Sequence, residues 1–383
     1  MYAKRTYVDF HVIQTVPPSC INRDDTGRPK TAVYGGALRA RVSSQAWKHA
    51  MREMFAEIYR ENSSYRTKYV ANLVADEMCR IDPAQDPKEA LNKAKDILTA
   101  VGVLKGKEKK GNTKKTEDAE DSTDKKEANK TLFFISTAQA HALAEAILNF
   151  GGMGTKDKLS KKEEDRFQDV LNQEPSVDIA LFGRMVANNT ALNVDAAAQV
   201  AHAISTHAIQ NEYDYFTAVD DYKPDDTAGA GFLGIQEYNA STLYRYATVN
   251  LQDLARMIGK ENAVEAVKAF ARAFICSMPT GKKNSYANRT LPDFVYVTIR
   301  NDQPVNFCGA FEKPVYSEVG GYVEKSEQKL MAYAQKVYEN FCDAPEAGFA
   351  IGDFALPEDM GVEKVNLKEL LNRLGDMAEN EVE

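Results

Sequence analysis

Cysteine is scarce in this chain, and its spacing excludes two classes of protein. The 383 residues contain five cysteines (Cys20, Cys79, Cys276, Cys308 and Cys342), and no two of them form a CxxC pair. Structural zinc sites need closely spaced cysteine pairs, and small disulfide-linked domains need an even, dense set. Scattered cysteines in odd number are typical of reduced thiols. The sequence therefore excludes a disulfide framework and a cysteine zinc site.

Histidine is equally scarce, with five residues in the chain. His202 and His207 are five residues apart on a predicted helix, a rotation of about 500°, so they point to different faces. This spacing argues against a histidine metal site. We expect neither a metal nor a cofactor.

Long apolar runs are also missing. No stretch approaches the roughly 18 residues that a membrane-crossing helix needs. Asp9 and His11 interrupt the apolar residues near the N-terminus, which argues against a signal peptide. We expect a cytoplasmic protein without membrane contact.

An overall excess of positive charge is absent, since the formal net charge is −8. The charges are nevertheless segregated. Residues 1–52 carry nine Lys/Arg against three Asp/Glu, and residues 357–383 carry three against eight. Local rather than total charge decides whether a surface binds a polyanion. The pattern predicts a basic functional surface near the N-terminus and an acidic C-terminal tail region at 346–383.

The first 60 residues predict a strand, a loop, a second strand and a helix. Residues 4–13 alternate in polarity, as a half-buried strand does, and the following residues to 30 are rich in turn formers. Residues 37–42 alternate again, which places Arg39 and Arg41 on one face of a strand. A helix follows Ser43 and Ser44, either of which can cap it. Its apolar face comprises Trp47, Met51, Met54, Phe55 and Ile58.

The rest of the chain predicts a mixed α+β fold. Residues 65–180 are predicted to be mostly helical. Residues 105–130 interrupt them with nine lysines and seven acids, a composition that predicts a mobile, solvated insertion rather than a specific binding element. The later pattern predicts a helix at 195–210, a long hairpin at 212–240, a strand at 241–251, a helix at 262–277 and strands at 293–300 and 304–311. Without the insertions, a βαββαβ-like order remains, which is that of the ferredoxin-like or RRM-type sandwich. Such a sheet suits single-stranded RNA.

Residues 22–52 concentrate groups that bind phosphate. Gln45, Lys48 and Arg52 form one stripe of the predicted helix, whose N-terminus favours anions. Residues 22–52 contain two acids, Asp24 and Asp25, and seven cations: Arg23, Arg28, Lys30, Arg39, Arg41, Lys48 and Arg52. A solvated helix face would explain one such pair, but seven cations favour polyanion binding. Amides, hydroxyls and cations together suit phosphate and sugar rather than base edges.

Several segments resemble a known family. They are SCINRDD at 19–25, VYGGALRARVSSQAWKHAMR at 33–52, VDIALFGRM at 177–185, AHAISTHAI at 201–209, DYFTAVDD at 214–221, LYRYATVNL at 243–251 and AFEKPV at 310–315. In this order they are similar to the backbone subunit of the type I-E CRISPR Cascade complex, the CasC family. The asparagine–arginine loop combined with SSQ-x-x-K-x-x-x-R carries most of the specificity.

The resemblance implies a hand-shaped, non-catalytic protein. Its RRM-like palm would comprise 1–60 and 180–345, its helical fingers insertion 61–179, and its protruding thumb hairpin 212–240. Copies would stack head to tail along a CRISPR RNA (crRNA) and present it to a target DNA strand. The other expected partners are the remaining Cascade subunits: the 5′-handle-capping subunit, the large subunit, the small subunit and the repeat-processing endoribonuclease.

The same resemblance assigns RNA contacts residue by residue. In the loop and helix they are Asn22, Arg23, Lys30, Ser43, Gln45, Lys48 and Arg52, and the predicted strand adds Arg41. Phe216 and Thr217 lie at the base of the thumb. Arg184 and Met185 complete the set of contacts, and Met185 takes the place where an apolar side chain wedges against a displaced base. Considered alone, an apolar Met185 would indicate core packing.

Two alternatives remain from the residues themselves. A metal-dependent ribonuclease could use the pairs Asp24–Asp25, Asp220–Asp221 and Asp225–Asp226, but two-metal hydrolysis needs further converging ligands that the sequence does not reveal. A nucleotide-binding enzyme is suggested by GGMGTK at 151–156. That segment lacks the P-loop spacing and a preceding strand.

Overall fold

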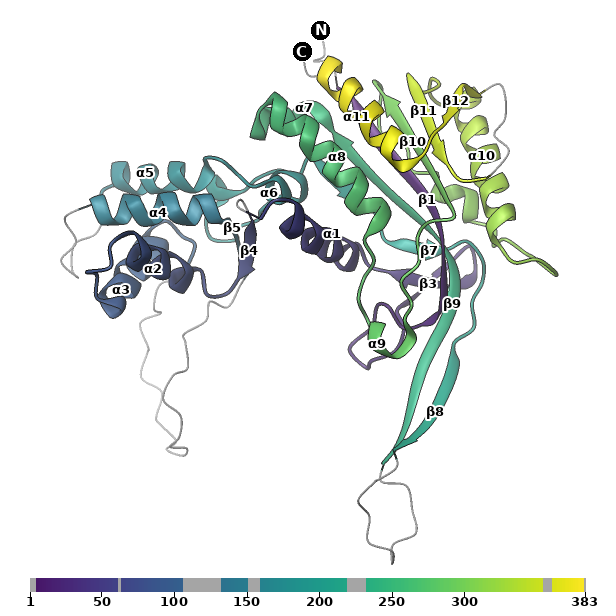
Figure 1. Ribbon diagram of the computed structural model, residues 1–383, viewed down its shortest axis with the longest axis horizontal. Helices are drawn as coiled ribbons and strands as arrows, with labels where there is room; N and C mark the ends of the chain where they lie inside the picture. The colour runs from purple at the N-terminus through teal and green to yellow at the C-terminus, as the bar shows by residue number, and fades with distance from the viewer. Residues whose placement is uncertain are drawn as a thin grey trace, which may run out of the picture. The chain divides into compact units, whose positions relative to one another are not determined.

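The computed structural model describes residues 5–60, 63–105, 132–150, 159–218, 232–353 and 360–381 (Figure 1). The chain forms two compact units: unit 1 comprises Met1–Phe55 and Ala198–Glu383, and unit 2 comprises Ala56–Ala197. Almost all of the charged segment 105–130, the GGMGTK segment and the tip of the predicted hairpin lie outside the described residues. None of the described helices is long and apolar enough to cross a membrane.

Unit 1 is built on one mainly antiparallel sheet. Its central strand β1 (Tyr7–Ser19) pairs with β9 (Phe232–Asn250) on one side and β10 (Phe294–Arg300) on the other. The full order is β12-β11-β10-β1-β9-β7-β3-β2, and β6 and β8 also pair with β9. The remaining strands are β2 (Thr31–Tyr34), β3 (Ala37–Val42), β6 (Ala198–Val200), β7 (Ala203–Ser205), β8 (Glu212–Ala218), β11 (Ala347–Ile351) and β12 (Val362–Lys364).

Helices cover both faces of this sheet (Figure 1). Phe10 of β1 contacts Phe270 and Phe274 on one face, where α11 packs against α8. On the other face, Ile13 packs in a cluster with residues of η2 and α10. The helices of unit 1 are α1 (Ser44–Ile58, whose last turn enters unit 2), α7 (Leu251–Ile258), α8 (Lys260–Cys276), α9 (Lys283–Tyr286), η2 (Phe307–Phe311), α10 (Val323–Asn340) and α11 (Leu367–Glu381).

Unit 2 is helical around its own core. A two-stranded sheet of β4 (Ser64–Thr67) and β5 (Phe133–Ser136) accompanies the helices. Caps fix two helix starts: Asp86 accepts backbone hydrogen bonds at α3, and Ser136 forms a capping box with Gln139 at α4. The helices are α2 (Val70–Ile81), α3 (Pro87–Ala100), α4 (Thr137–Asn149), α5 (Lys161–Asn172), α6 (Val177–Phe182) and η1 (Thr190–Leu192).

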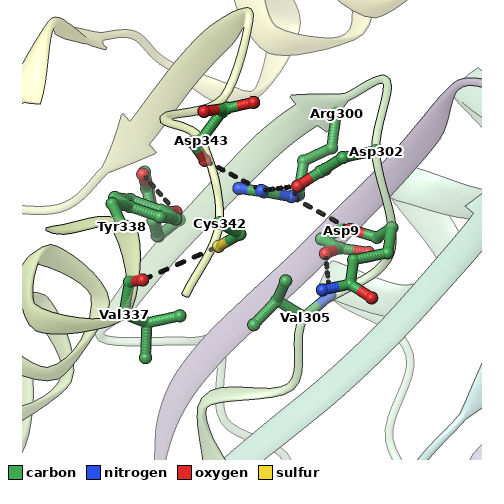
Figure 2. A network of polar contacts seen from close by, with 10 residues as sticks. Asp9, Arg300, Asp302, Val305, Val337, Tyr338, Cys342 and Asp343 are labelled. Carbon is green, nitrogen blue, oxygen red and sulfur yellow. Dashed lines mark hydrogen bonds and ion pairs between the residues drawn. The ribbon is translucent and has the colours of Figure 1, made fainter. Parts of the chain in front are cut away.

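The polar side of β1 is buried rather than solvent-exposed, which differs from the predicted half-buried strand. Asp9 accepts hydrogen bonds from the Val305 amide at 2.7 Å and from the Tyr246 hydroxyl at 3.1 Å. Arg300 donates to Asp302 and to the Asp343 carbonyl at 2.9 Å, which fixes the end of α10 (Figure 2). Buried polar groups are tolerated only when they are hydrogen-bonded, and this network provides the partners.

The mixed α+β class is confirmed, but two predicted elements are wrong. Residues 195–210 form the short strands β6 and β7 instead of a helix, because they pair with β9 and β3. Residues 304–311 form no strand; η2 occupies Phe307–Phe311, and the Asn306 side chain accepts a hydrogen bond from the Cys308 amide at its start. Apolar content alone does not distinguish these conformations.

Residues 346–383, predicted as an acidic tail region, contribute regular elements to unit 1. Within residues 346–383, β11 extends the sheet beside β10, and α11 packs on α8. Leu370, Leu371 and Leu374 bury the apolar face of α11. Its acids Glu369, Asp376 and Glu379 are exposed.

His11 should make the stability of the fold sensitive to acid. Burial lowers the pKa of His11 to about 3, and the Arg300 charge acts in the same direction. Between pH 6.5 and 3 the unfolded chain therefore binds a proton that the folded chain does not, and stability falls as pH falls. Relative to His11→Phe, the wild type should lose about 2 kcal/mol between pH 7 and pH 5.

Urea unfolding of both proteins at the two pH values measures this difference, with His49→Phe at an exposed position as the control. The hydrogen bond between His11 and Tyr244 is lost in the variant at both pH values and does not enter the comparison. An equal pH response of wild type and His11→Phe would contradict the assignment.

Candidate nucleic-acid interface

The loop after β1 is tied to the start of α1 by the Asn22 side chain. Its Oδ1 accepts a hydrogen bond from the Ser43 amide at 2.9 Å. The Lys30 amide donates to the Asn22 carbonyl, and the Arg41 amide donates to the Lys30 carbonyl, both at 2.9 Å. These bonds bring the loop, β3 and the first turn of α1 together. The structure thus unites four of the predicted contact residues at one junction.

A small pocket opens at this junction. Its polar lining consists of Ser19, Asn22, Lys30, Arg41, Asn239 and Ser241, and apolar side chains of β1 and β3 form its floor. The Ser19 hydroxyl donates to the Pro17 carbonyl and the Asn239 amide to Asn211, so both have partners within the protein. The cations Lys30 and Arg41 give the pocket groups that suit phosphate oxygens.

Asp24 has a structural task in the loop. Its Oδ1 accepts hydrogen bonds from the Thr26 amide at 2.9 Å, the Thr26 hydroxyl at 2.8 Å and the Arg28 amide at 2.9 Å. The Thr26 hydroxyl bond and the Arg28 amide hold the pKa of Asp24 below its usual value. The carboxylate therefore shapes the loop and turns Arg23 outward with it; Arg23 is exposed.

No observation favours the ribonuclease alternative. Within the described ranges, no group of three His, Cys, Asp or Glu side chains is placed to hold a metal ion. Asp220–Asp221 and Asp225–Asp226 lie outside the described residues.

A buried arginine fixes the orientation of α1. Arg245 stacks on Trp47 at 3.7 Å and on Phe274 at 4.6 Å, and it donates to Gln14 at 2.5 Å. Burial lowers its pKa to about 9. With Trp47 anchored inward, Gln45 is exposed, whereas Lys48 and Arg52 are half-buried along the same stripe.

Arg39 and Arg41 have different roles, although both were predicted on a basic face. Arg39 is fully buried and donates to the Ser205 and Phe311 carbonyls at 2.8 Å, so it cannot contribute to a surface. Arg41 remains half-exposed, with its guanidinium held by the Thr31 carbonyl and the His202 ring, both at 3.1 Å. Burial and the Arg41 charge lower the pKa of His202, which favours a neutral ring beside the guanidinium.

The hairpin of β8 and β9 projects from the sheet (Figure 1). Phe216 pairs with Gly234, and a Cβ at Gly234 would lie 2.3 Å from the Phe216 ring. Only glycine lets the ring lie across the opposite strand. Thr217, one residue further, is exposed like the rest of β8.

Arg184, predicted as an RNA contact, lies in unit 2 with its side chain directed into the protein. Its guanidinium is buried and donates to the Leu192 carbonyl at 2.8 Å, the Leu171 carbonyl at 3.0 Å and Asn172 at 2.9 Å. Burial lowers its pKa to about 10. Arg184 thereby braces the loop that carries Met185.

Met185 projects from the loop that Arg184 holds in place, and 84% of its surface is exposed. Before it, Arg184 and Val194 exchange backbone hydrogen bonds at 2.9 and 2.8 Å. After it, the Val186 amide donates to Asn193 at 2.7 Å. The exposure excludes the alternative of core packing for Met185 in this structure, and the flanking bonds hold it as a fixed apolar projection.

One basic segment went unnoticed in the sequence. Residues 279–290, PTGKKNSYANRT, carry Lys282, Lys283 and Arg289 without an acid. Gly281 packs against the loop, because a Cβ there would lie 2.3 Å from the Ile21 carbonyl oxygen. The run of cations without an acid could have indicated a basic surface here. Nothing in the sequence linked it to a loop some 260 residues earlier.

Comparison with known proteins identifies the family. The family model described as CT1975-like protein matches residues 8–376. The chain belongs to the CT1975-like protein family. No curated protein matched it.

Two solved structures resemble this member of the CT1975-like family over nearly its full length. One, titled "CRISPR RNA-guided surveillance complex, pre-nicking", shares 33% identity at a TM-score of 0.80, covering 97% of this chain and 100% of that one. The other, titled "CRISPR RNA-guided surveillance complex", shares 29% identity at a TM-score of 0.69, covering 96% and 99%. These matches confirm the resemblance to a Cascade backbone subunit.

Replacing Asn22 should loosen the junction. Asn22→Ala leaves the buried Ser43 amide without an acceptor, at a cost of about 1–3 kcal/mol. Asn22→Asp retains an acceptor oxygen and should stay close to wild type. Thermal unfolding compares the three proteins, and hydrogen exchange should show faster exchange at Ser43 in Asn22→Ala alone. Unchanged exchange at Ser43 would mean that this bond does not hold the loop.

Proposed function

We propose that this protein is the non-catalytic crRNA-binding backbone subunit of a type I-E Cascade surveillance complex. The observation that carries the proposal is the junction at which Asn22, Lys30 and Arg41 meet the start of α1. Membership of the family and the likeness to subunits of CRISPR RNA-guided surveillance complexes support it.

The chemistry of the junction favours backbone recognition. Lysine and arginine neutralise phosphates, while amides and hydroxyls bond to phosphate or ribose oxygens. Such contacts carry no sequence information. The bases of the guide stay available for pairing with a target DNA strand, which then supplies sequence discrimination, as in other RNA-guided systems.

The fold is compatible with the proposed hand-shaped architecture. The strand order β10-β1-β9-β7, with α1 and α8 in the connections, supports an RRM-like palm. Unit 2 would form the fingers, and the hairpin of β8 and β9 the thumb. Head-to-tail copies along the guide would then repeat these contacts, with the other Cascade subunits at the ends and flanks.

Met185, Phe216 and Thr217 would act on the bases rather than on phosphates. A fixed, exposed methionine can wedge against a base and unstack it. Phe216 offers an aromatic surface for stacking, with Thr217 beside it. In an assembled filament, these residues would displace guide nucleotides at intervals set by the subunit repeat.

Lys48→Ala tests the proposed RNA contact. Loss of one phosphate contact to single-stranded RNA should lower the magnitude of the slope of log K against log salt by about 0.7. The loss of affinity should be the same for guides of unrelated sequence, because the contact is to the backbone. Fluorescence anisotropy with labelled RNAs at several salt concentrations measures both quantities.

The control is Lys368→Ala on α11, an exposed lysine that removes the same charge elsewhere in unit 1. It should keep the wild-type slope. A Lys48→Ala protein with wild-type slope, or one that loses affinity for some sequences only, would contradict backbone recognition at this residue.

A further inference from the structure

Residues 279–290, here called the GKK segment, carry three cations: Lys282, Lys283 and Arg289. Lys283 and Arg289 are exposed and Lys282 is half-buried. Residues 277–292 contain no Asp or Glu. Among the described residues, no carboxylate is recorded within ion-pair distance of any of the three, whereas Lys268 and Arg300 of the same unit are paired. None of the three cations therefore forms an ion pair with a described carboxylate, although Asp24 and Glu237 lie near Cys20 beside Lys282, and Asp214 lies near Tyr286.

The GKK segment lies between the Asn22 loop and the base of the hairpin of β8 and β9 (Figure 1). On the loop side, Gly281 packs against the Ile21 backbone. Burial raises the pKa of the Cys20 thiol, and the charges of Arg23 and Lys282 act in the opposite direction, since both lie near that sulfur.

On the hairpin side, Gln236 of β9 donates to the Tyr286 hydroxyl at 2.7 Å. The Tyr286 ring also lies 6.1 Å from that of Tyr238. The segment therefore joins two elements that the proposed function already places along the RNA.

The backbone of the segment is held in an unfavourable conformation. Lys282 and Ala287 have φ of 52° and 47°, the left-handed region that non-glycine residues seldom occupy. They flank α9, and the buried Asn288 side chain reaches back to the Gly281 carbonyl at 3.5 Å. Such conformations cluster at binding sites, where the surroundings maintain them.

We propose that the GKK segment is an additional phosphate-binding site for single-stranded RNA, with Lys282 and Lys283 as its contacts. The site is separate in sequence from the α1 stripe and extends the interface from the Asn22 loop toward the hairpin. The proposal rests on the proposed function, because the ligand is the same RNA strand.

The test is the double variant Lys282→Gly/Lys283→Ala in the full chain. Glycine accepts φ of 52° without strain, so the first change removes the charge while favouring the native backbone. The matched control is Lys336→Ala/Lys368→Ala, which removes two exposed charges from α10 and α11. Anisotropy with a labelled single-stranded RNA across a salt series is compared with Lys48→Ala.

We expect the double variant to lower the slope of log K against log salt by about 1.4, two contacts at about 0.7 each. Combined with Lys48→Ala, the losses should add, as they do for separate contacts. The control should retain the wild-type slope. Lys283→Glu, a single change at an exposed position, should weaken binding further than Lys283→Ala and serves if the double variant is unstable in thermal unfolding.

The outcomes separate the two proposals. If Lys48→Ala lowers the slope but the double variant and Lys283→Glu match the control, the GKK site is refuted and the proposed function stands. If wild-type binding does not depend on salt, or if RNA is not bound, both are refuted.

Discussion

The interface depends on one hydrogen bond between a side chain and the backbone, from the Ser43 amide to Asn22. It joins the start of an irregular loop to the start of a helix, and it adds to the backbone hydrogen bonds that hold the loop beside β3. Backbone hydrogen bonds link Lys30 to Asn22 and Arg41 to Lys30. The spacing of these polar residues therefore does not rely on flexible side chains. Preorganisation of this kind reduces the entropy lost on binding.

The hydrogen bond between Ser43 and Asn22 can hold the loop only because the elements on either side of it are rigid. Trp47 and Arg245 lock α1 onto the sheet, and the network of Asp9 and Arg300 fixes the central strand against η2 and the end of α10. Both arrangements bury charge, which is tolerable only with the hydrogen bonds and ring contacts seen here. The polar side of β1, which the sequence predicts to face solvent, is thus buried and belongs to an internal hydrogen-bond network.

Local pattern predicted β1, β3, α1, α8, β10 and the hairpin, because each has a clear periodicity or strong end signals. It failed where tertiary pairing overrides the local preference, as at residues 195–210, where β6 and β7 are short strands completed by β9. It also could not tell a buried arginine from an exposed one. Arg39 and Arg184 bond to carbonyls contributed by residues that only the fold brings near. Asn22, Lys30, Arg41 and Ser43 meet at one junction, since they are close in sequence. The GKK segment was not predicted because its neighbours in the fold are distant in sequence.

The arginines and lysines therefore divide into two groups, and the division explains how a chain of net charge −8 can carry a locally basic surface. Arg39, Arg184, Arg245 and Arg300 are internal struts whose charge is directed at carbonyls, rings or Asp302. Three acids of α11 are exposed. What remains at the junction of the loop, β3, α1 and the GKK segment is a local group of cations supplied by two distant parts of the sequence, residues 22–52 and 279–290. A surface assembled from several segments can follow a phosphate backbone over more than one nucleotide, and no single segment has to read a base.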